Sequence, residues 1–323
     1  MKIFSLHNVS LFCLFLSFVL TYSGCKKTDN GLSELDLYIA ENELIKSQSS
    51  ISDDSSSEST TATTTSDNGD YLLPNIDLNN WKITLPIGNP TSVRPPDILD
   101  YATNATLKPF FYNDSIDGSL VFYTYPANST PNSSYSRTEL REQMVPGSDN
   151  TNWTFAQGGR MRGVLSVPEV TFDENGDEHR IIVMQIHGRL TNQQRDLIGE
   201  NDNNAPPMLK IYWQKGRVRI KTKVVKNLDA TYEELLHESA WGNDEGYTIP
   251  VDVNNDKFAI EIIVSEGSME VVLNDEHSVI YNDIHIQKWG IFENYFKAGN
   301  YFQSRDEGSF ARVKYYELEI SHD

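Results

Sequence analysis

Tyr295-Phe296-Lys297-Ala298-Gly299-Asn300-Tyr301-Phe302-Gln303, near the C-terminus, is patterned as a β-strand. Successive side chains of a strand point to opposite faces of the sheet. One face would then carry Tyr295, Lys297, Gly299, Tyr301 and Gln303, and the other face a mostly apolar set. A glycine inside a strand weakens it and marks close approach of a ligand or another backbone. The segment therefore predicts a strand whose polar face is either an ordinary wet surface or part of a binding site.

Residues 71–323 are patterned as strands throughout. Glu266-Gly267 and Asn175-Gly176 are typical of tight turns between antiparallel strands. We see no composition break and no internal repeat, and about 250 residues suffice for one large core. Many short strands with few helical stretches predict an all-β jelly-roll sandwich formed as one domain. The predicted strands include residues 120–125, 180–187, 258–264, 269–273 and 313–320.

The first 25 residues have the layout of an export signal. Lys2 is followed by an apolar run at residues 11–20, which is too short to span a bilayer. Small residues precede Cys25 as in a bacterial lipoprotein cleavage site, although Tyr22 stands where an aliphatic residue is more usual. The other cysteine, Cys13, lies in the same segment, so the domain is expected to lack an internal disulfide.

We therefore expect a lipid on Cys25 and a location on an outer membrane or cell surface. An ordinary signal peptide, giving a secreted or periplasmic protein, is the alternative. Residues 26–70 predict a disordered tether, because the stretch 47–66 is almost entirely Ser, Thr, Asp and Glu. Such a tether would reach roughly 35–40 Å, which is enough to hold the domain clear of a membrane.

The chain is strongly acidic, with a formal net charge of −19 from 46 acidic and 27 basic residues. This balance argues against nucleic acid as a partner. One stretch nevertheless alternates basic and apolar residues, so that five cations would share one face of a strand. That face is either a solvated surface or the positive floor of a site for a polyanion, and the acidity of the rest favours the second interpretation. The five are Lys215, Arg217, Arg219, Lys221 and Lys223.

A second polar strand face is expected within residues 135–143. Alternation places Arg137, Glu139, Arg141 and Gln143 together. A glutamate between two arginines would lock their planar guanidinium groups and leave donors free for a ligand carboxylate. The plain alternative is a surface ladder of ion pairs, which contributes little to stability.

A third polar face is expected at Gln185-Ile186-His187. Alternation puts Gln185 and His187 on one face, together with Ile181 and Val183. A single histidine at a strand end with satisfied hydrogen bonds is the plain alternative. Each polar face alone has a plain structural explanation, and only the three together favour a binding site.

Taken in order, the three segments resemble the signature blocks of alginate lyases of polysaccharide lyase family 7. They read Arg-Thr-Glu-Leu-Arg at 137–141, Gln-Ile-His at 185–187 and Tyr-Phe-Lys-Ala-Gly-Asn-Tyr at 295–301, and residues 76–86 are similar to the family's N-terminal strand. The resemblance implies a concanavalin-like jelly roll with an open cleft across a concave sheet, and an anionic polysaccharide as the partner. It implies a catalytic set of Arg137, Gln185, His187 and Tyr301, with substrate contacts from Glu139, Arg141, Tyr295, Lys297 and Gln303. The basic strand would add Arg217, Arg219 and Lys221.

The chemistry of these residue types suits β-elimination from a 4-linked uronan. The C5 proton is α to a carboxylate, so its removal requires neutralisation of a second negative charge, which Arg137 and Gln185 would supply. A neutral His187 is suited to accept that proton near pH 7, and the phenol of Tyr301 is suited to protonate the departing O4. This chemistry requires no metal or other cofactor. The remaining histidines show no ligand spacing, and residues 173–177 lack the pattern of a calcium loop.

Three alternatives stay open at this point. A lyase for another polyuronate, such as glucuronan, uses the same chemistry. A non-catalytic polysaccharide-binding sandwich would also present Tyr, Arg and Gln. A glycoside hydrolase needs a pair of carboxylates, and Glu139 has no acidic partner in these segments. In the family, isoleucine at the position of Ile186 tends to accompany activity on guluronate-containing blocks, so we expect that preference. We also expect a monomer.

Overall fold

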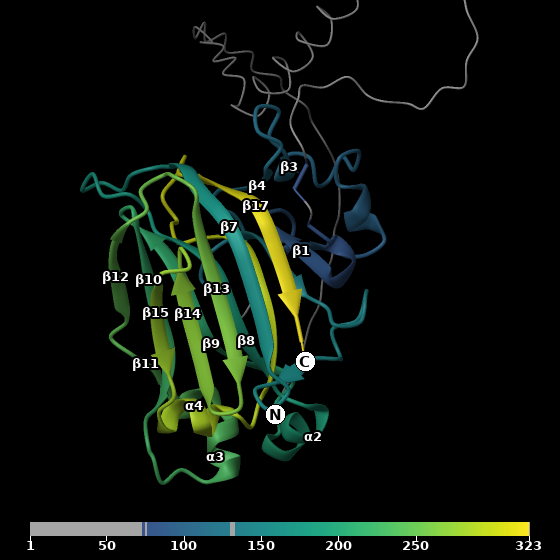
Figure 1. The fold of residues 1–323 in the computed structure, drawn as a ribbon. Helices are drawn as coiled ribbons and strands as arrows, with labels where there is room; N and C mark the ends of the chain where they lie inside the picture. The colour runs from purple at the N-terminus through teal and green to yellow at the C-terminus, as the bar shows by residue number, and fades with distance from the viewer. Residues whose placement is uncertain (1–72, 75, 130–132, 323) are drawn as a thin grey trace, which may run out of the picture. The chain divides into compact units, whose positions relative to one another are not determined.

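The computed structural model describes residues 73–74, 76–129 and 133–322. The predicted export signal, Cys25 and the tether lie outside these residues. The described chain forms two antiparallel sheets that face each other, and the predicted all-β sandwich is confirmed (Figure 1). Within the described residues, none of the helices is long and apolar enough to cross a membrane.

The larger sheet contains β1 (Trp81–Leu85), β2 (Thr91–Val93), β5 (Arg137–Glu142), β6 (Trp153–Thr154), β8 (Ile181–Arg189), β9 (Asn204–Gln214), β10 (Arg217–Val225), β11 (Trp241–Asn243), β12 (Tyr247–Asp252) and β16 (Glu293–Phe302). In the described residues its order is β11-β10-β9-β8-β16-β5-β1-β2, with β12 paired to β10 and β6 paired to β16.

The smaller sheet contains β3 (Phe111–Asn113), β4 (Leu120–Thr124), β7 (Gly159–Val170), β13 (Phe258–Ser265), β14 (Ser268–Leu273), β15 (His277–Tyr281) and β17 (Ala311–Ser321). Its order is β15-β14-β13-β7-β17-β4-β3. The α-helices are α2 (Asn192–Ile198), α3 (Tyr232–Leu236) and α4 (Ile284–Trp289), and the 3₁₀ turns are η1 (Leu78–Asn80), η2 (Asp97–Asp100) and η3 (Glu238–Ala240).

The three α-helices of the described residues lie together at one end of the sheets (Figure 1). Two of them start with a capping box. In each, the threonine hydroxyl accepts from the backbone N–H three residues further on, and the side chain of that later residue accepts from the backbone N–H of the threonine. The pairs are Thr191 with Gln194 and Thr231 with Glu234. These short helices therefore begin where local hydrogen bonding dictates, and they leave the sheet faces uncovered along most of their length.

The core lies between the two sheets. The central strand β16 contributes Phe296, Ala298 and Phe302, all fully buried, while Lys297 and Tyr301 lie on its other face. The alternation predicted for this strand is confirmed. Asn300 is the polar exception on the core side: its Nδ2 donates to the carbonyls of Phe122 at 3.0 Å and Ala311 at 2.8 Å. The asparagine therefore ties β16 to two strands of the smaller sheet.

A β-bulge corrects one predicted face. Ile182 lies opposite Tyr212 and Met184 opposite Ile211, so Val183 is an extra residue in β8. An inserted residue reverses the alternation on one side of it. Val183 and Ile181 belong to the core, whereas Ile182 contacts Tyr212 and Tyr301 on the outer face. The prediction that Ile181 and Val183 share the face of Gln185 was wrong for this reason.

The irregular pairing of β8 and β16 is stabilised from the opposite sheet. The hydroxyl of the buried Tyr315, from β17, accepts the N–H of Gly299 at 3.2 Å and donates to the carbonyl of Val183 at 2.7 Å. Gly299 has φ +138°, and a Cβ there would lie 2.7 Å from the carbonyl oxygen of Thr138. The close approach expected at this glycine is thus made by the backbone of β5.

Replacing Tyr315 by phenylalanine should destabilise the domain selectively. The Tyr315→Phe change leaves the N–H of Gly299 and the carbonyl of Val183 buried without their partner, at a cost of about 1–3 kcal/mol. Tyr316→Phe is the matched control, since its hydroxyl is bound to Ser166 and Asp117 in a partly exposed position. Urea unfolding of both variants checks the difference, and equal stabilities would contradict the bridging role.

Candidate active site

The three predicted polar faces lie side by side because β8, β16 and β5 are neighbours in the larger sheet. Residues directly opposite each other in a sheet have interacting side chains. Strand register therefore assembles the predicted residues into transverse rows. The rows are His187 beside Tyr295, Gln185 beside Lys297 and Arg141, and Tyr301 beside Arg137.

Glu139 is the acceptor at the centre of these rows. Its carboxylate accepts from Arg137 Nη1 at 3.2 Å and from Gln185 Nε2 at 2.5 Å, and it forms an ion pair with Lys297 Nζ. Only 1% of its surface is exposed. Glu139 is therefore placed to hold three side chains from three strands, whereas the sequence had predicted a substrate contact.

Arg141 is likewise occupied by the protein. Its guanidinium donates to Asp149 Oδ1 at 2.9 Å, to Asn152 Oδ1 at 3.0 Å and to the carbonyl of Glu142 at 2.9 Å. It also lies 4.1 Å above the ring of Tyr295. The loop after β5 returns Asp149 over the strand, so Arg141 positions Tyr295 and keeps few donors for a ligand.

His187 is held as a neutral base. Its ring stacks on Tyr295 with centroids 5.1 Å apart. Its Nδ1 lies 3.0 Å from the carbonyl of Gly188, and a carbonyl only accepts, so we infer that Nδ1 carries the proton and Nε2 the lone pair. Burial, followed by the nearby cations Lys297 and Arg137, lowers the pKa of His187 well below its ordinary value. The imidazole is therefore uncharged at pH 7.

Lys297 and Tyr301 flank this base along β16. Burial and the neighbouring Arg137 lower the pKa of Lys297 to about 7, and Glu139 opposes that shift. Arg137 lies 4.0 Å from the centroid of the Tyr301 ring. Gln303 is half-buried, and its Nε2 donates to the carbonyl of Tyr301 at 3.2 Å. The predicted catalytic set is thus gathered in one place, with Gln185 buried beneath Arg137 and His187, which are the partly exposed members.

The structure places most of the predicted basic face around one hollow. Lys215 lies in the turn before β10 and pairs with Asp177 at 2.8 Å, and it lines the same hollow as Arg217. Arg217 pairs with Asp252 at 2.6 Å. Arg219 donates to the Thr248 hydroxyl and to a backbone carbonyl of the same neighbouring segment. Lys223 is buried. Four of the five predicted cations thus line one hollow on this side of the sheet, whereas Lys223 is buried and does not line it.

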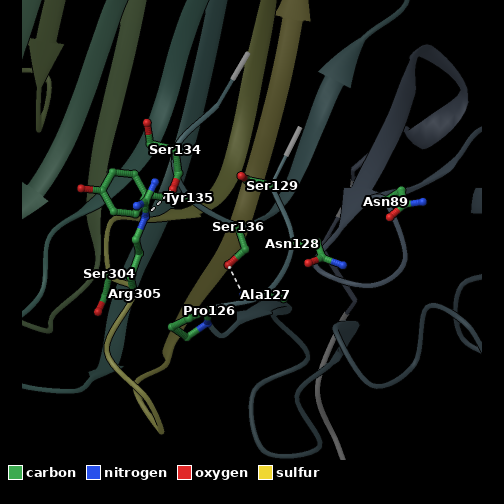
Figure 2. A pocket seen from close by; sticks show the side chains of 10 residues that line it. All are labelled: Asn89, Pro126, Ala127, Asn128, Ser129, Ser134, Tyr135, Ser136, Ser304 and Arg305. Carbon is green, nitrogen blue, oxygen red and sulfur yellow. Dashed lines mark hydrogen bonds between the residues drawn. The ribbon is translucent and has the colours of Figure 1, made fainter. Parts of the chain in front are cut away.

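Sequence reasoning missed residues that β9 and the loops bring to the same face. Lys210 lies opposite Gln185, and Tyr212 contacts Tyr301. The alternation of Lys210 and Tyr212 with apolar neighbours was the available signal. Beyond Tyr301, a polar cavity of about 740 Å³ is lined by Tyr135 and Arg305, which Figure 2 shows close together. The Arg305 guanidinium lies 5.5 Å from the Tyr135 ring.

The site offers no evident place for a metal ion. Across the described parts of the chain, no three His, Cys, Asp or Glu side chains are grouped so that they could hold one. The groups that gather here are a neutral imidazole, a phenol, two cations and an amide around one buried carboxylate. Such a set suits proton transfer beside a negatively charged ligand.

Comparison with known proteins identifies the class. Residues 76–322 match a family of alginate lyases, and the chain belongs to that family. It is a polysaccharide lyase with the family 7 jelly-roll fold. Alginate lyase A1-II', a member of polysaccharide lyase family 7, is 30% identical, with a TM-score of 0.60, over 77% of this chain and 96% of that one.

Two further solved structures are similar. A doubly substituted variant of A1-II' in complex with the substrate GGMG is 29% identical, with a TM-score of 0.60, covering 77% of this chain and 94% of that one. The alginate lyase from Klebsiella pneumoniae is 20% identical, with a TM-score of 0.58 and coverage of 77% and 97%, and it supports the fold alone. No curated protein matches the sequence significantly.

Glu139→Gln should impair both catalysis and stability, because buried Lys297 and Arg137 lose their anionic partner. An amide cannot accept from all three donors, so Arg137 and Gln185 lose their fixed positions, and misplacement on this scale costs about 10²-fold in kcat. Loss of the negative charge also lowers the pKa of Lys297 further below about 7, so the alkaline limb of the kcat/KM profile should move to lower pH.

The control for this prediction is Glu261→Gln, which removes a carboxylate paired with Arg160 on the smaller sheet. The control should keep parental kcat and pH profile. Lyase assays on a polyuronate across pH, with melting temperatures measured in parallel, provide the check. A Glu139→Gln enzyme with unchanged kcat and an unchanged alkaline limb would contradict the positioning role.

Proposed function

We propose that the enzyme cleaves alginate by β-elimination and leaves an unsaturated 4-deoxy-hex-4-enuronate at the non-reducing end of the product. The observation that carries the proposal is His187, a neutral imidazole with Nε2 as its lone-pair nitrogen, beside Arg137 and Lys297. A family relative of about 29% identity has been solved with the substrate GGMG and, in a singly substituted form, with the product GGG.

Carboxylate neutralisation is the first requirement of the reaction. Removing the C5 proton places a second negative charge on the uronate, and fixed cations stabilise that charge best in a site with little water. Arg137 and Lys297 supply positive charge. Gln185 Nε2 donates one hydrogen to Glu139, and its other amide hydrogen is left for the substrate. Because Glu139 already holds all three, little reorganisation is needed when the charge develops.

Proton transfer completes the elimination. His187 Nε2 accepts the C5 proton, the electrons of the C5–H bond form the C4–C5 double bond, and the C4–O4 bond breaks. Tyr301 donates its hydroxyl proton to O4. This oxygen stays on C1 of the preceding sugar and becomes the anomeric hydroxyl of the new reducing end. The proton on His187 then returns to solvent and Tyr301 is reprotonated, so no water is consumed.

A substrate panel tests the reaction type. Digestion of alginate should yield products that absorb in the ultraviolet and are lighter by one water than the corresponding hydrolysis products. Tyr301→Phe should lower kcat by about 10²–10⁴-fold, and Tyr316→Phe on the smaller sheet should not. Saturated products that have gained one water per cleavage would show hydrolysis. Faster cleavage of glucuronan than of alginate would assign a different polyuronate.

We also propose a preference for guluronate-containing blocks. In guluronate the C5 proton and O4 lie on opposite faces of the ring, so the base and the acid should approach from different sides. His187 and Tyr301 lie in different rows on neighbouring strands, with Gln185 and Lys297 between them. Ile186 is fully buried in the core, so any influence it has on preference is indirect, through the packing beneath His187.

His187→Ala should therefore slow the cleavage of guluronate-rich blocks more than that of mannuronate-rich blocks, since in mannuronate both groups lie on one face and one tyrosine can serve both steps. Initial rates on the two block polymers, normalised to the parental enzyme, measure the difference. An equal loss on both polymers would contradict the assignment of separate acid and base.

For localisation, we propose a lipid anchor on Cys25 at an outer membrane or cell surface, supported by the small residues before this cysteine. Labelling with a fatty-acid analogue should mark the parental protein and not a Cys25→Ala variant. If the variant fractionates with membranes as the parent does, the anchor is wrong.

A further inference from the structure

A second buried carboxylate, Glu142, stands at the end of β5 on the side of the core. Only 1% of its surface is exposed. Its Oε2 accepts from Trp153 Nε1 at 3.0 Å and from the backbone N–H of Phe296 at 2.8 Å. Its Oε1 lies 2.5 Å from Nε2 of His322, which follows β17. One carboxylate thus connects three strands of the larger sheet to the end of a strand in the smaller sheet.

Glu142 replaces backbone pairing at a point where two strands part. In the described chain, β5 and β16 pair as far as Arg141 opposite Lys297. Beyond that point the N–H of Phe296 donates to the Glu142 side chain. Phe296 lies between Tyr295 and Lys297 in the chain, so the backbone that this carboxylate holds carries two side chains of the candidate active site.

Both of those side chains contact groups of the proposed mechanism. Tyr295 stacks on His187, the proposed base, and Lys297 pairs with Glu139. The backbone at Phe296 therefore sets two neighbouring rows at once. The carboxylate that holds this backbone is buried in the core, out of reach of a ligand on the outer face.

The contact between His322 and Glu142 contains a shared proton. Nδ1 of His322 lies 3.2 Å from the carbonyl oxygen of Gly158, which only accepts, so we infer that Nδ1 is protonated. A second proton must lie between Nε2 and Glu142 Oε1, because two lone pairs 2.5 Å apart repel each other. The pair as a whole is uncharged, whichever of the two groups holds this proton.

Loss of the shared proton would leave a charge in the core. The imidazole lies against Phe296 and Trp153, with ring centroids 5.9 and 5.5 Å away, and a Cβ at Gly159 would come within 3.0 Å of it. Among the described residues, Glu142 forms its ion pair with His322. Without the proton, the carboxylate would stay buried with no counter-charge, which is strongly unfavourable.

The strands around the imidazole identify Glu142 as its ionisable partner. β5 supplies Glu142, whereas β6 and β16 supply aromatic rings. On β7, Arg160 lies opposite Ser321 and is paired with Glu261. The proton balance of the pair therefore depends chiefly on His322 and Glu142 themselves.

We propose that His322 is a positioning residue for the elimination. With the shared proton in place it holds Glu142, and through Glu142 it holds the backbone of Phe296 beneath Tyr295 and Lys297. Loss of that proton as the pH rises releases this part of β16. The kinetic consequence rests on the proposed function, whereas the shared proton is independent of it.

His322→Gln tests the positioning role, since glutamine keeps a side-chain amide but cannot carry the charge. The groups that face the substrate keep their identity and lose their exact placement, so kcat on alginate should fall about tenfold or more while KM stays within about twofold. His277→Gln is the matched control, because His277 is partly exposed on β15 and pairs with Glu276. The control should keep parental kcat and KM. A His322→Gln enzyme with parental kcat would overturn the positioning role.

The pH dependence of stability separates a shared proton from simple packing. The folded chain holds this proton and the unfolded chain releases it more readily. In urea unfolding, the stability advantage of the parent over His322→Gln should therefore be largest near about pH 6 and shrink as the pH rises to about 9. His277→Gln should show no such trend. A difference that stays constant with pH would overturn the shared proton, because lost packing does not titrate.

Failure of the two proposals can be told apart. A parental enzyme that does not cleave alginate would end the proposed function, and the urea experiment would still decide the shared proton. A pH-dependent stability difference without any loss of kcat would overturn the positioning role and leave the lyase mechanism standing.

Discussion

The buried carboxylate of Glu139 is the interaction on which the proposed active site depends. Burying a carboxylate costs several kcal/mol unless donors compensate it. Here the donors are Arg137, Gln185 and Lys297, which come from β5, β8 and β16. The compensation exists only when these strands are neighbours in the right register, so the stability of this part of the sheet and the geometry of the site have one cause.

The opposite sheet supports that register. Tyr315 and Asn300 carry hydrogen bonds across the apolar core and hold the irregular pairing of β8 with β16 in one arrangement. Tyr301 follows directly after this irregularity, so the position of the proposed acid is set by polar contacts made on the far side of its own strand. A neighbouring row, by contrast, is fixed from the outer face of the sheet, where Arg141 and Asp149 hold Tyr295.

Charge is distributed unevenly over the outer face of the larger sheet. On the β1 side, Asp149 accepts from Lys82 and Arg141, so each of these cations has an acidic partner. On the β9 and β10 side, Lys210 and Lys221 have no such partner among the described residues. A polyanion lying across the sheet would therefore be attracted to one flank, even though the protein as a whole repels it.

The sequence by itself determined which residues share a face in β5 and β16, because side-chain alternation is a local property of an extended chain. Arg137 and Glu139, Lys297 and Tyr301, and Gln185 and His187 could each be placed on one strand face in this way. The order of the three segments along the chain was enough to indicate the lyase family. Local alternation could not reveal the extra residue Val183, since a bulge depends on how two partner strands pair.

The tertiary structure alone showed which protein groups bind Glu139, Arg141 and Lys215. Each was predicted as part of a ligand-binding face, and each also has partners that depend on the folded chain: Lys297 and Gln185 for the first, Asp149 for the second and Asp177 for the third. Lys210 gained its importance in the same way, from a register that sets it beside Gln185. Ion pairs form between groups that folding brings within a few ångströms, and a linear pattern carries no information about those distances.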